Sequence, residues 1–517
     1  MKTHATQPFG NAGGPTLIRC AIGSRPAAAQ QLANGCPIAV SDYLDSYFLG
    51  PSALLCAVSL RVVHTPLGGR RSSMGSGPRE MELGSNSEPV FVCHALLSSY
   101  DIDGEANMAS GRSAAAQAFA EDRIPTYRID LSLPPRERYV ELATDFAPRM
   151  RRITPLFDTV LASFIPWSFL RSIVRFSASL RLRRVHSHEE TQELKGIAKA
   201  SGVDMYFLVA FNLLLDALLG CTSGGVLTRP EGDKGSERSR QAGRRSLRRM
   251  NRMMHFRTLD WGMPELRDIL VVLEFVRSAS PEPEKVIMRT VSYAGFVGTL
   301  TGVRKNLSVS LNFRANHHCS TLSLRIHQAL VLLGIRPSVS SILRHGLLHA
   351  EEGDAEIDNM ANTMRRARAT PCYVILCSGR KTVVLQKDLY DAEYRSADDF
   401  IVHTNHDFPP TDPSDGASIQ NQTNFILGME GALEESEERQ DCMQKKWTAL
   451  VRRRGRNAKR EEGQEPVAVD EQTLRWWVQS YPIMNECTHF GCILDPGTGT
   501  IRWLERGVDD LDIENWE

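Results

Sequence analysis

Hydrophobic and polar residues along this chain predict ordered structure only after about residue 120. Residues 1–120 are rich in Gly, Ala, Ser and Pro with weak periodicity, which is typical of a poorly ordered region. The segment TYRIDLSL then alternates apolar and polar positions, the period of a half-buried strand. SHEETQELKGIAKASGV begins with a Ser cap and early acidic residues and ends near Gly202, as helices do. Residues 121–220 are therefore predicted to form a small, mostly helical region with one strand.

After residue 220, strand-like segments dominate the chain. MMHFRTLDWG, ILVVLEFVRS, VIMRTVSYAGFVGTLTGV and LSVSLNF predict strands, and helices are expected within 321–368. CYVILCS and KTVVLQKDL predict a hairpin around Gly379 and Arg380. Residues 430–455 have the pattern of a charged helix, and the tail predicts a final helix and a hairpin with the turn DPGTG. This distribution indicates an α+β fold built from sheet and helix layers.

Composition and charge narrow the class of protein. The chain has 517 residues and is 42% hydrophobic, enough for a sizeable core. Lys+Arg and Asp+Glu both total 61, and this balance argues against a nucleic-acid partner. The basic segment 228–252 predicts a solvated loop inserted between two strands, with a nucleic-acid or localisation patch as the alternative. The start of the chain has no apolar run of the kind found in signal peptides, so the sequence leaves the compartment open.

The cysteines are the first residues to consider as metal ligands, disulfide partners or nucleophiles. The 11 cysteines are scattered without C-x-x-C spacing, so we expect neither a zinc site nor a disulfide framework. Cys221 stands apart because it follows the apolar run LLLDALLG and precedes the small residues TSGG. A cysteine in this position is either a buried structural thiol or a nucleophile.

Four segments that follow one another in the chain favour the nucleophile. CTS at 221–223, HFRTLD at 255–260, YAGFVGTLTG at 293–302 and HTNHD at 403–407 resemble the acid ceramidase and N-acylethanolamine-hydrolysing acid amidase family of N-terminal-nucleophile hydrolases. Upstream, IPTYRIDLSLPPRERYVEL and ELKGIAKASGVDMYFLVAFNLLLD resemble that family's small N-terminal subunit. The resemblance covers about residues 122–410 and is closer to acid ceramidase. It implies an αββα sandwich over 221–517, the catalytic domain, preceded by the small subunit-like region 121–220.

The resemblance also implies self-processing. A cut between Gly220 and Cys221 would free an α-amine on the nucleophile itself, with a reference pKa of about 7.7–8.0. The apolar run before Cys221 carries no nearby histidine that could serve as the base, which fits activation by this amine. The thiolate would attack the amide of an N-acyl lipid, with ceramide preferred and N-acylethanolamine as the alternative. No cofactor and no metal are implied.

Four further residues are candidates through this resemblance. Arg257 and Asp260 match the family's Arg-x-x-Asp, where Arg257 would stabilise the thiolate and Asp260 would orient the freed α-amine. Asn405 is the candidate donor to the oxyanion, and Arg439 is a weaker match to an arginine that shapes the site. The alternatives are a plain ion pair with Asp260 for Arg257 and a strand-end cap or surface salt bridge for Asp260. Asn405 could instead be a turn asparagine, and Arg439 could face solvent on its charged helix. Three histidines are expected to be structural rather than metal ligands: His403, His406 and His489.

This chain departs from the family pattern in three ways. The family has an acidic residue after a Leu-Asn pair, where this chain has Phe313. Cys221 and Arg257 lie 36 residues apart, farther than is usual, because of the basic insert. The secretory signal that would accompany a lysosomal, vacuolar or secreted protein is not visible. A catalytically inactive lipid-binding homologue therefore stays open as an alternative.

An N-acyl lipid has to be taken from a bilayer, and residues 156–176 are suited to a lipid surface. This segment, LFDTVLASFIPWSFLRSIVRF, combines aromatic and basic residues in a way that predicts peripheral membrane contact. Packing inside the small helical region is the alternative. The residues concerned are Phe157, Phe164, Ile165, Trp167, Phe169 and Leu170 beside Arg171 and Arg175.

Overall fold

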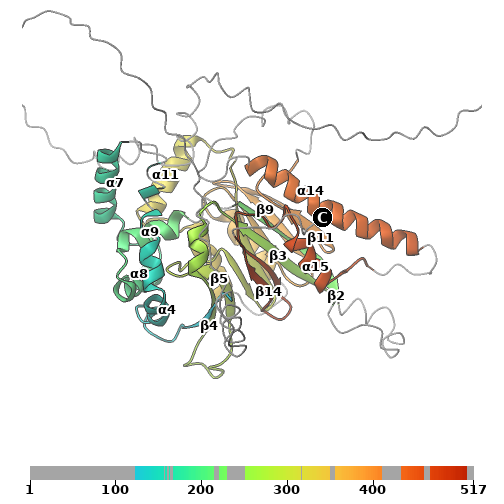
Figure 1. Ribbon diagram of the computed structural model, residues 1–517, viewed down its shortest axis with the longest axis horizontal. Coiled ribbons are helices and arrows are strands. Elements are labelled where there is room, and N and C mark those ends of the chain that lie inside the picture. Colours follow the sequence, from blue (N-terminus) through green and yellow to red (C-terminus); the bar gives the residue numbers. More distant parts are fainter. Residues whose placement is uncertain are drawn as a thin grey trace, which may run out of the picture. The chain divides into compact units, whose positions relative to one another are not determined.

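The structure is a computed structural model (Figure 1). It describes residues 123–508 except 157, 160, 161, 163–166, 215–219, 230–250, 316, 350–355, 410–431 and 459–465. The predicted N-terminal region 1–120 and most of the basic segment 228–252 lie outside the described residues. All described residues belong to one compact unit, Tyr43–Glu517.

The small region begins with one strand and continues with helices. Its elements are β1 (Thr126–Asp130), α4 (Val140–Asp145), α5 (Ala147–Arg152), α7 (Ser168–Arg181), α8 (His188–Ser201) and α9 (Met205–Leu214). The Ser187 hydroxyl accepts the Glu190 N–H at 3.3 Å and so caps α8. The helix ends at Gly202, whose φ of 73° suits glycine. The first described helix, α4, begins at Val140, and the Pro134-Pro135 pair before it lies in a turn.

Strands dominate the rest of the chain. They are β2 (Gly220–Arg229), β3 (Arg252–Asp260), β4 (Leu270–Val276), β5 (Met288–Tyr293), β6 (Thr301–Arg304), β7 (Leu307–Phe313), β8 (Cys372–Cys377), β9 (Thr382–Lys387), β10 (Ala392–Ala397), β11 (Phe400–His403), β12 (Val469–Asp470), β13 (Thr488–Asp495) and β14 (Thr500–Arg506). The helices among them are η3 (Pro264–Ile269), α11 (Thr321–Leu332), α12 (Val339–His349), α13 (Glu356–Arg366), α14 (Ala432–Ala458) and α15 (Glu471–Gln479). The segment AGFVG, predicted as part of a strand, instead lies in the connection between β5 and β6.

These strands form two sheets in the described part of the chain. The first sheet has the order β1-β4-β5-β6-β7-β8-β9-β10, and β1 pairs in parallel with β4. The small N-terminal region therefore supplies an edge strand to this sheet. The second sheet has the order β11-β2-β3-β13-β14, with β12 also beside β2. Thr228 pairs with Arg252, so the basic insert joins two neighbouring antiparallel strands, as predicted.

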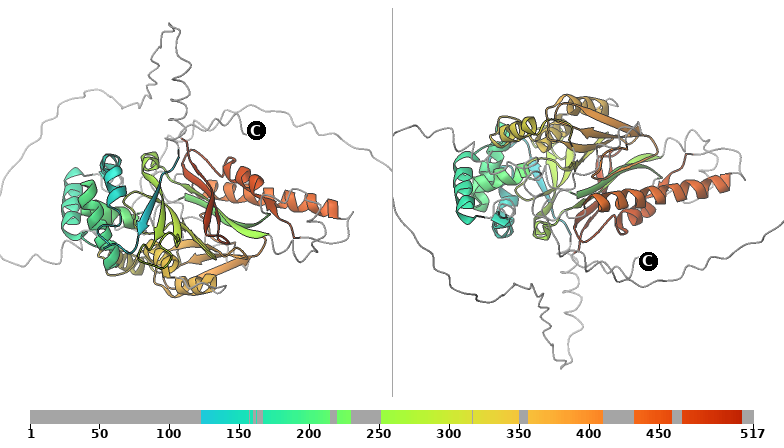
Figure 2. Two further views of the ribbon diagram at one scale, coloured as in Figure 1. Left: turned by 90° about the horizontal axis from the view of Figure 1, so that it is seen from below. Right: turned by 90° about the horizontal axis from the view of Figure 1, so that it is seen from above.

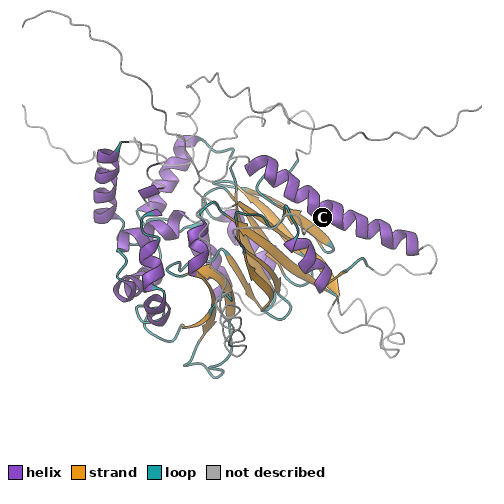
Figure 3. Ribbon diagram, viewed as in Figure 1, coloured by secondary structure: helices purple, strands orange, loops and turns teal. Residues whose placement is uncertain are grey.

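The sheets pack face to face between two helical layers (Figures 1 and 2). Strand β2 contacts β7, β8 and β9 across the sheet interface. Helices α12 and α13 pack on the first sheet, and α14 and α15 pack on the second. Figure 3 shows the strands enclosed by helices on both sides. This αββα arrangement confirms the predicted fold class.

Both faces of β2 and β3 are buried, so their residues show no apolar–polar alternation. Val226, Met254 and Phe256 pack under α14 with Met443 and Trp447. The alternate residues of the two strands point to the first sheet instead, because successive strand side chains point to opposite faces. This second set includes two residues of the predicted site, Cys221 and Arg257, together with their strand partners Leu259 and Ser223.

The glycine pair after Cys221 lets β2 approach its neighbours closely. A Cβ atom on Gly224 would lie 2.1 Å from the Ile401 carbonyl oxygen. A Cβ atom on Gly225 would lie 1.9 Å from the Thr382 Oγ1 atom of the facing sheet. Any side chain at these positions would force the strands apart.

Buried polar contacts join the small region to the rest of the molecule. Glu193 of α8 accepts a hydrogen bond from Arg344 Nη2 of α12 at 2.7 Å, and both side chains are buried. Asn212 of α9 donates to the Gly295 carbonyl at 2.8 Å and accepts the Val297 N–H at 2.8 Å. These contacts and the pairing of β1 with β4 do not depend on the peptide bond that joins residues 220 and 221.

Candidate active site

Cys221 lies near the start of β2, with its side chain in the interface between the two sheets. Its main-chain nitrogen donates to Asn405 Oδ1 at 2.8 Å. Its Sγ atom accepts a hydrogen bond from Arg257 Nη2 at 3.1 Å and lies 3.7 Å from the Leu311 carbonyl oxygen. The residue is fully buried. The nitrogen and the sulfur of Cys221 are thus held by two different partners from distant parts of the chain.

Arg257 reaches the sulfur because of the strand register. Cys221 pairs with Leu259 and Ser223 pairs with Arg257, so Arg257 and Cys221 lie on the same face of the sheet. The fully buried guanidinium also donates to the carbonyls of Leu311 at 2.8 Å and Leu300 at 3.1 Å. Two main-chain carbonyls thus hold this cation against the thiol.

The thiol's protonation reflects two opposing influences. Burial raises the pKa of Cys221 and the neighbouring Arg257 guanidinium opposes the rise, so that the resulting pKa is about 11. Burial prevails because a thiolate enclosed in the core loses its hydration. In the intact chain the thiol therefore holds its proton near neutral pH, and a base is needed to generate the nucleophile.

Asp260 lies beside the peptide bond before Cys221, since it pairs with Gly220. Its Oδ1 atom accepts from the Thr488 hydroxyl at 2.6 Å, and its Oδ2 atom lies 3.9 Å from Arg439 Nη1. Burial raises the pKa of this carboxyl, and Arg439 counteracts the rise. Arg257 and Asp260 point to opposite faces of β3, so they do not form the plain ion pair considered as an alternative.

Asn405 follows β11 and bridges Cys221 to two other elements. Its Oδ1 atom accepts from Cys221 N and from Arg439 Nη2 at 3.1 Å. Its Nδ2 atom donates to the Phe313 carbonyl at 2.9 Å. The carboxamide therefore presents an acceptor to the nitrogen of Cys221, while its donor group is engaged by Phe313. The Nδ2 group has two N–H donors, so its hydrogen bond to Phe313 does not by itself prevent the predicted donation to an oxyanion.

Arg439 is buried with 3% of its surface exposed, although it lies on the charged helix α14. The sequence does contain a signal for this burial, which the charge of the helix conceals. Ser436, Arg439, Met443 and Trp447 recur at helical spacing and are all buried. The same stripe includes Ser436, which the sequence did not reveal as a site residue. Its hydroxyl accepts the Asn405 N–H at 2.8 Å.

Of the three predicted structural histidines, His403 and His489 are buried and His406 is half-buried. His489 donates from Nε2 to the Trp261 carbonyl at 3.0 Å and accepts from the Tyr293 hydroxyl at 2.7 Å. Burial lowers the pKa of both His403 and His489 to about 3. His406 contacts the hydroxyls of Thr404 and Ser436. Within the described ranges, no cluster of His, Cys, Asp or Glu has the arrangement of a metal site.

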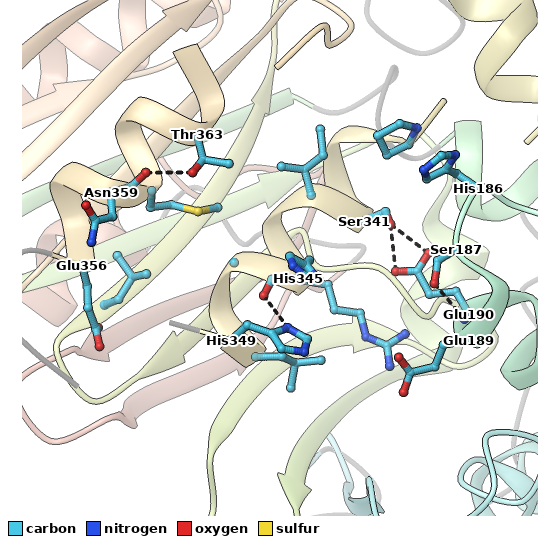
Figure 4. A pocket seen from close by; sticks show the side chains of 17 residues that line it. His186, Ser187, Glu189, Glu190, Ser341, His345, His349, Glu356, Asn359 and Thr363 are labelled. Carbon is cyan, nitrogen blue, oxygen red and sulfur yellow. Dashed lines mark hydrogen bonds between the residues drawn. The ribbon is translucent and has the colours of Figure 1, made fainter. Parts of the chain in front are cut away.

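A cavity of about 500 Å³ lies elsewhere, between α8, α12 and α13 (Figure 4). Histidines and carboxylates line it, among them His345, His349, Glu189 and Glu190. The Ser341 hydroxyl donates to Glu190 at 2.9 Å inside it. None of the five predicted site residues lines this cavity.

Comparisons with known proteins find similarity to N-acylethanolamine-hydrolyzing acid amidase and to acid ceramidase. The profile described as the beta subunit of N-acylethanolamine-hydrolyzing acid amidase matches residues 122–186. Acid ceramidase of Heterocephalus glaber is 26% identical over 309 residues, which are 55% of this chain and 70% of that protein. Acid ceramidase of Homo sapiens is 24% identical over 310 residues, with the same coverage. This chain is therefore similar to acid ceramidases over about half of its length, and its residues 122–186 match the N-acylethanolamine-hydrolyzing acid amidase profile.

One solved structure with this family's name is also similar. The Caenorhabditis elegans N-acylethanolamine-hydrolyzing acid amidase ortholog is 19% identical, with a TM-score of 0.34. The match covers 53% of this chain and 93% of the C. elegans chain.

The departure from the family pattern at Phe313 lies away from the Cys221 side of β7. Ser308 and Ser310 hydrogen-bond His255 of the facing sheet, and Asn312 accepts from the Ser223 hydroxyl at 2.9 Å. Side chains alternate along a strand, so Phe313 points to the opposite, apolar face and joins the main core. Its main-chain carbonyl still holds Asn405, a contact that does not depend on the side chain.

Proposed function

We propose that this protein is a cysteine amide hydrolase that cleaves N-acyl lipids, with ceramide as the first candidate substrate. The observation that carries the proposal is the pair of contacts at Cys221. Its sulfur accepts from Arg257 at 3.1 Å, and its main-chain nitrogen donates to Asn405 at 2.8 Å. A nucleophile that is also its own base needs both of its atoms held in place.

Cleavage between Gly220 and Cys221 supplies the missing base. The freed α-amine, with an ordinary pKa of about 7.7–8.0, takes the thiol proton. The thiolate attacks the carbonyl carbon of the lipid amide, and Arg257 stabilises the charge on sulfur. The ammonium then returns its proton to the leaving nitrogen as the carbon–nitrogen bond breaks. Water hydrolyses the thioester, which releases a fatty acid and restores the thiol.

Asp260, Asn405 and Arg439 complete the proposed site. Asn405 Oδ1 keeps the Cys221 nitrogen in place before the cut, and it can accept from the ammonium afterwards. Asp260 pairs with Gly220 and so lies beside the new amino terminus. Arg439 lies 3.9 Å from Asp260 and hydrogen-bonds Asn405, which ties the two acceptors together. In the cleaved enzyme, Asn405 Nδ2 also stabilises the oxyanion by donating a hydrogen bond to it.

The experiment should distinguish two alternative functions from ceramide hydrolysis. N-acylethanolamine hydrolysis would use the same acyl chemistry, and the family contains both activities by name. A catalytically inactive lipid-binding homologue is favoured by one observation, the complete burial of Cys221. In the intact chain, no substrate carbonyl can reach a sulfur that has no exposed surface.

Chain cleavage and turnover test the proposal together. We expect the purified chain, after incubation at acid pH, to separate on a denaturing gel into fragments of about 24 and 33 kDa, estimated from the position of the cut. Mass spectrometry should find Cys221 as the new amino terminus of the larger fragment. Ceramide and N-acylethanolamine are then offered separately to the cleaved protein. A chain that stays intact and hydrolyses neither lipid would favour the inactive homologue.

We further propose that α7 contacts the membrane surface from which the substrate is taken. Four apolar residues recur on one face of the helix and are exposed to solvent: Phe169, Ile173, Phe176 and Leu180. Arg171 and Arg175 fall between them in the sequence but lie on the opposite face of the helix, so the exposed apolar face carries the proposed contact. Phe157, Phe164 and Ile165 of the predicted segment lie outside the described residues. Among the described helices, none combines the length and the apolar composition needed to cross a bilayer.

Charged substitutions on α7 test this contact. Phe169 and Phe176 are 63% and 66% exposed, so replacing both by aspartate should leave the fold intact. We expect binding to anionic vesicles to fall by about tenfold or more, since a buried phenylalanine contributes about 1.5–3 kcal/mol. Vesicle co-sedimentation measures the change. Tyr394→Asp is the matched control, because Tyr394 is 58% exposed on β10. Equal binding by both variants would remove the membrane proposal.

A further inference from the structure

A buried ion pair lies two residues beyond Asn405. The carboxylate of Asp407 accepts from Arg314 Nε at 2.6 Å and from Arg314 Nη2 at 2.9 Å. The Tyr373 hydroxyl donates to the same carboxylate at 2.6 Å. The Arg314 and Asp407 side chains are only 1% and 9% exposed, so water screens the pair little.

The position of this pair in the chain connects it to the proposed site. Arg314 directly follows Phe313, whose carbonyl accepts from Asn405 Nδ2 at 2.9 Å. Asp407 ends the turn that contains Asn405. The ion pair and the Asn405–Phe313 hydrogen bond therefore join the same two segments, the end of β7 and the turn at 404–407. Two links between the same segments restrict the rotation of the carboxamide far more than either link alone.

Arg314 itself is anchored independently of Asp407. Its Nη1 atom donates to the Lys387 carbonyl at 3.1 Å and lies 3.4 Å from Asp388 Oδ2. The guanidinium is thus fixed to the end of β9, and the turn is attached to it through Asp407. Removing the charge of Asp407 would release the turn while leaving Arg314 in place.

We propose that Arg314 and Asp407 are a positioning pair that fixes the Asn405 carboxamide opposite the nitrogen of Cys221. This inference rests on the proposed function of Cys221. Neither residue touches the reacting atoms, so both act through Asn405. Asn405 also has Ser436 on its main-chain N–H and Arg439 on its Oδ1 atom, so loss of the pair displaces the carboxamide without freeing it. The expected effect is accordingly partial.

The experiment compares Asp407→Asn with a matched control, Asp495→Asn. Asp495 is also a buried carboxylate paired with an arginine, since it accepts from Arg252 at 3.1 Å. It lies at the other end of the second sheet, because Leu494 pairs with His255 while Thr488 pairs with Asp260. Both variants should lose thermal stability. The measured quantities are the rate of chain cleavage and the kcat and KM per titrated active site.

We expect Asp407→Asn to lower kcat and the cleavage rate by about 10- to 100-fold, because a small misplacement of a reacting group costs that much, with KM within about threefold of wild type. Asp495→Asn should keep the wild-type kcat per active site. If Asp407→Asn fails to fold, Arg314→Lys serves instead, since lysine keeps the charge but cannot make two parallel hydrogen bonds. A folded variant of the pair with wild-type kcat and cleavage rate would overturn the proposal. A wild-type chain without cleavage or turnover would instead overturn the proposed function.

Discussion

Replacing Cys221 by alanine is expected to leave the chain as a single uncut band and to lower amide hydrolysis by about 10⁴-fold or more, because loss of a nucleophile removes the covalent route altogether. The substitution deletes only the sulfur, whose contacts are Arg257 Nη2 and the Leu311 carbonyl. Arg257 keeps its hydrogen bonds to Leu300 and Leu311, so the site should hold its shape. Gel electrophoresis and a lipid-amide turnover assay measure the two losses.

The matched control for this variant is Cys377→Ala. Cys377 is also fully buried, and its thiol donates to the Met253 carbonyl at 3.8 Å. Burial raises its pKa to about 12, and no guanidinium counteracts that rise. Both substitutions should cost a similar amount of stability, since each leaves a cavity the size of one sulfur atom. Continued cutting of Cys221→Ala, or equal loss of activity in both variants, would contradict a nucleophilic Cys221.

Local signals in the sequence were sufficient for much of the fold. The Ser187 cap, the glycine at the end of α8 and the hairpin at Gly379 each depend on a few adjacent residues. The apolar run before Cys221 and the small residues after it singled this residue out, whereas its place near the start of the buried strand β2 is known from the structure. Arg257 and Asp260 followed from the resemblance of a short segment to a family.

The orientation of Asn405 could not be predicted, because it depends on residues far away in the chain. Asn405 lies 184 residues from Cys221 and 92 residues from Phe313. Whether its oxygen or its nitrogen faces Cys221 is decided by which partner is a main-chain donor and which is a carbonyl. That information arises only when the ends of β2, β7 and β11 come together.

The burial of Arg439 could not be predicted from the sequence for a different reason. A helix with many charged residues, such as α14, predicts a solvated element, and the charge outweighs the weak apolar stripe beneath it. Arg439 is buried because Asp260 and Asn405 offer it acceptors from the adjacent sheet. A buried cation becomes acceptable only with such partners. They come from other segments, so no single stretch of sequence reveals the burial.

Replacing Arg257 by glutamine is expected to have the second-largest effect, a fall in kcat/KM of about 10²- to 10³-fold at acid pH, since it removes the charge that is in contact with sulfur. The Arg257 guanidinium lowers the pKa of the Cys221 thiol against the effect of burial. Without it the pKa rises, so at any pH below that value a smaller fraction of the thiol is ionised. Each unit of increase removes about nine-tenths of the remaining thiolate. The rising limb of the pH–rate profile should therefore move to higher pH.

Two further variants show whether this effect comes from the charge at the sulfur. Arg257→Lys keeps a positive charge but cannot serve the sulfur and the carbonyls of Leu300 and Leu311 together, so its pH profile should shift less than that of Arg257→Gln. Arg304→Lys is the control, because Arg304 is buried and donates to the Leu347 carbonyl at 2.8 Å, outside the site. It should lose stability and keep the wild-type pH profile. An unshifted profile for Arg257→Gln, with activity lost only in proportion to folded protein, would mean that Arg257 is a structural cation and that the thiolate is stabilised by other groups.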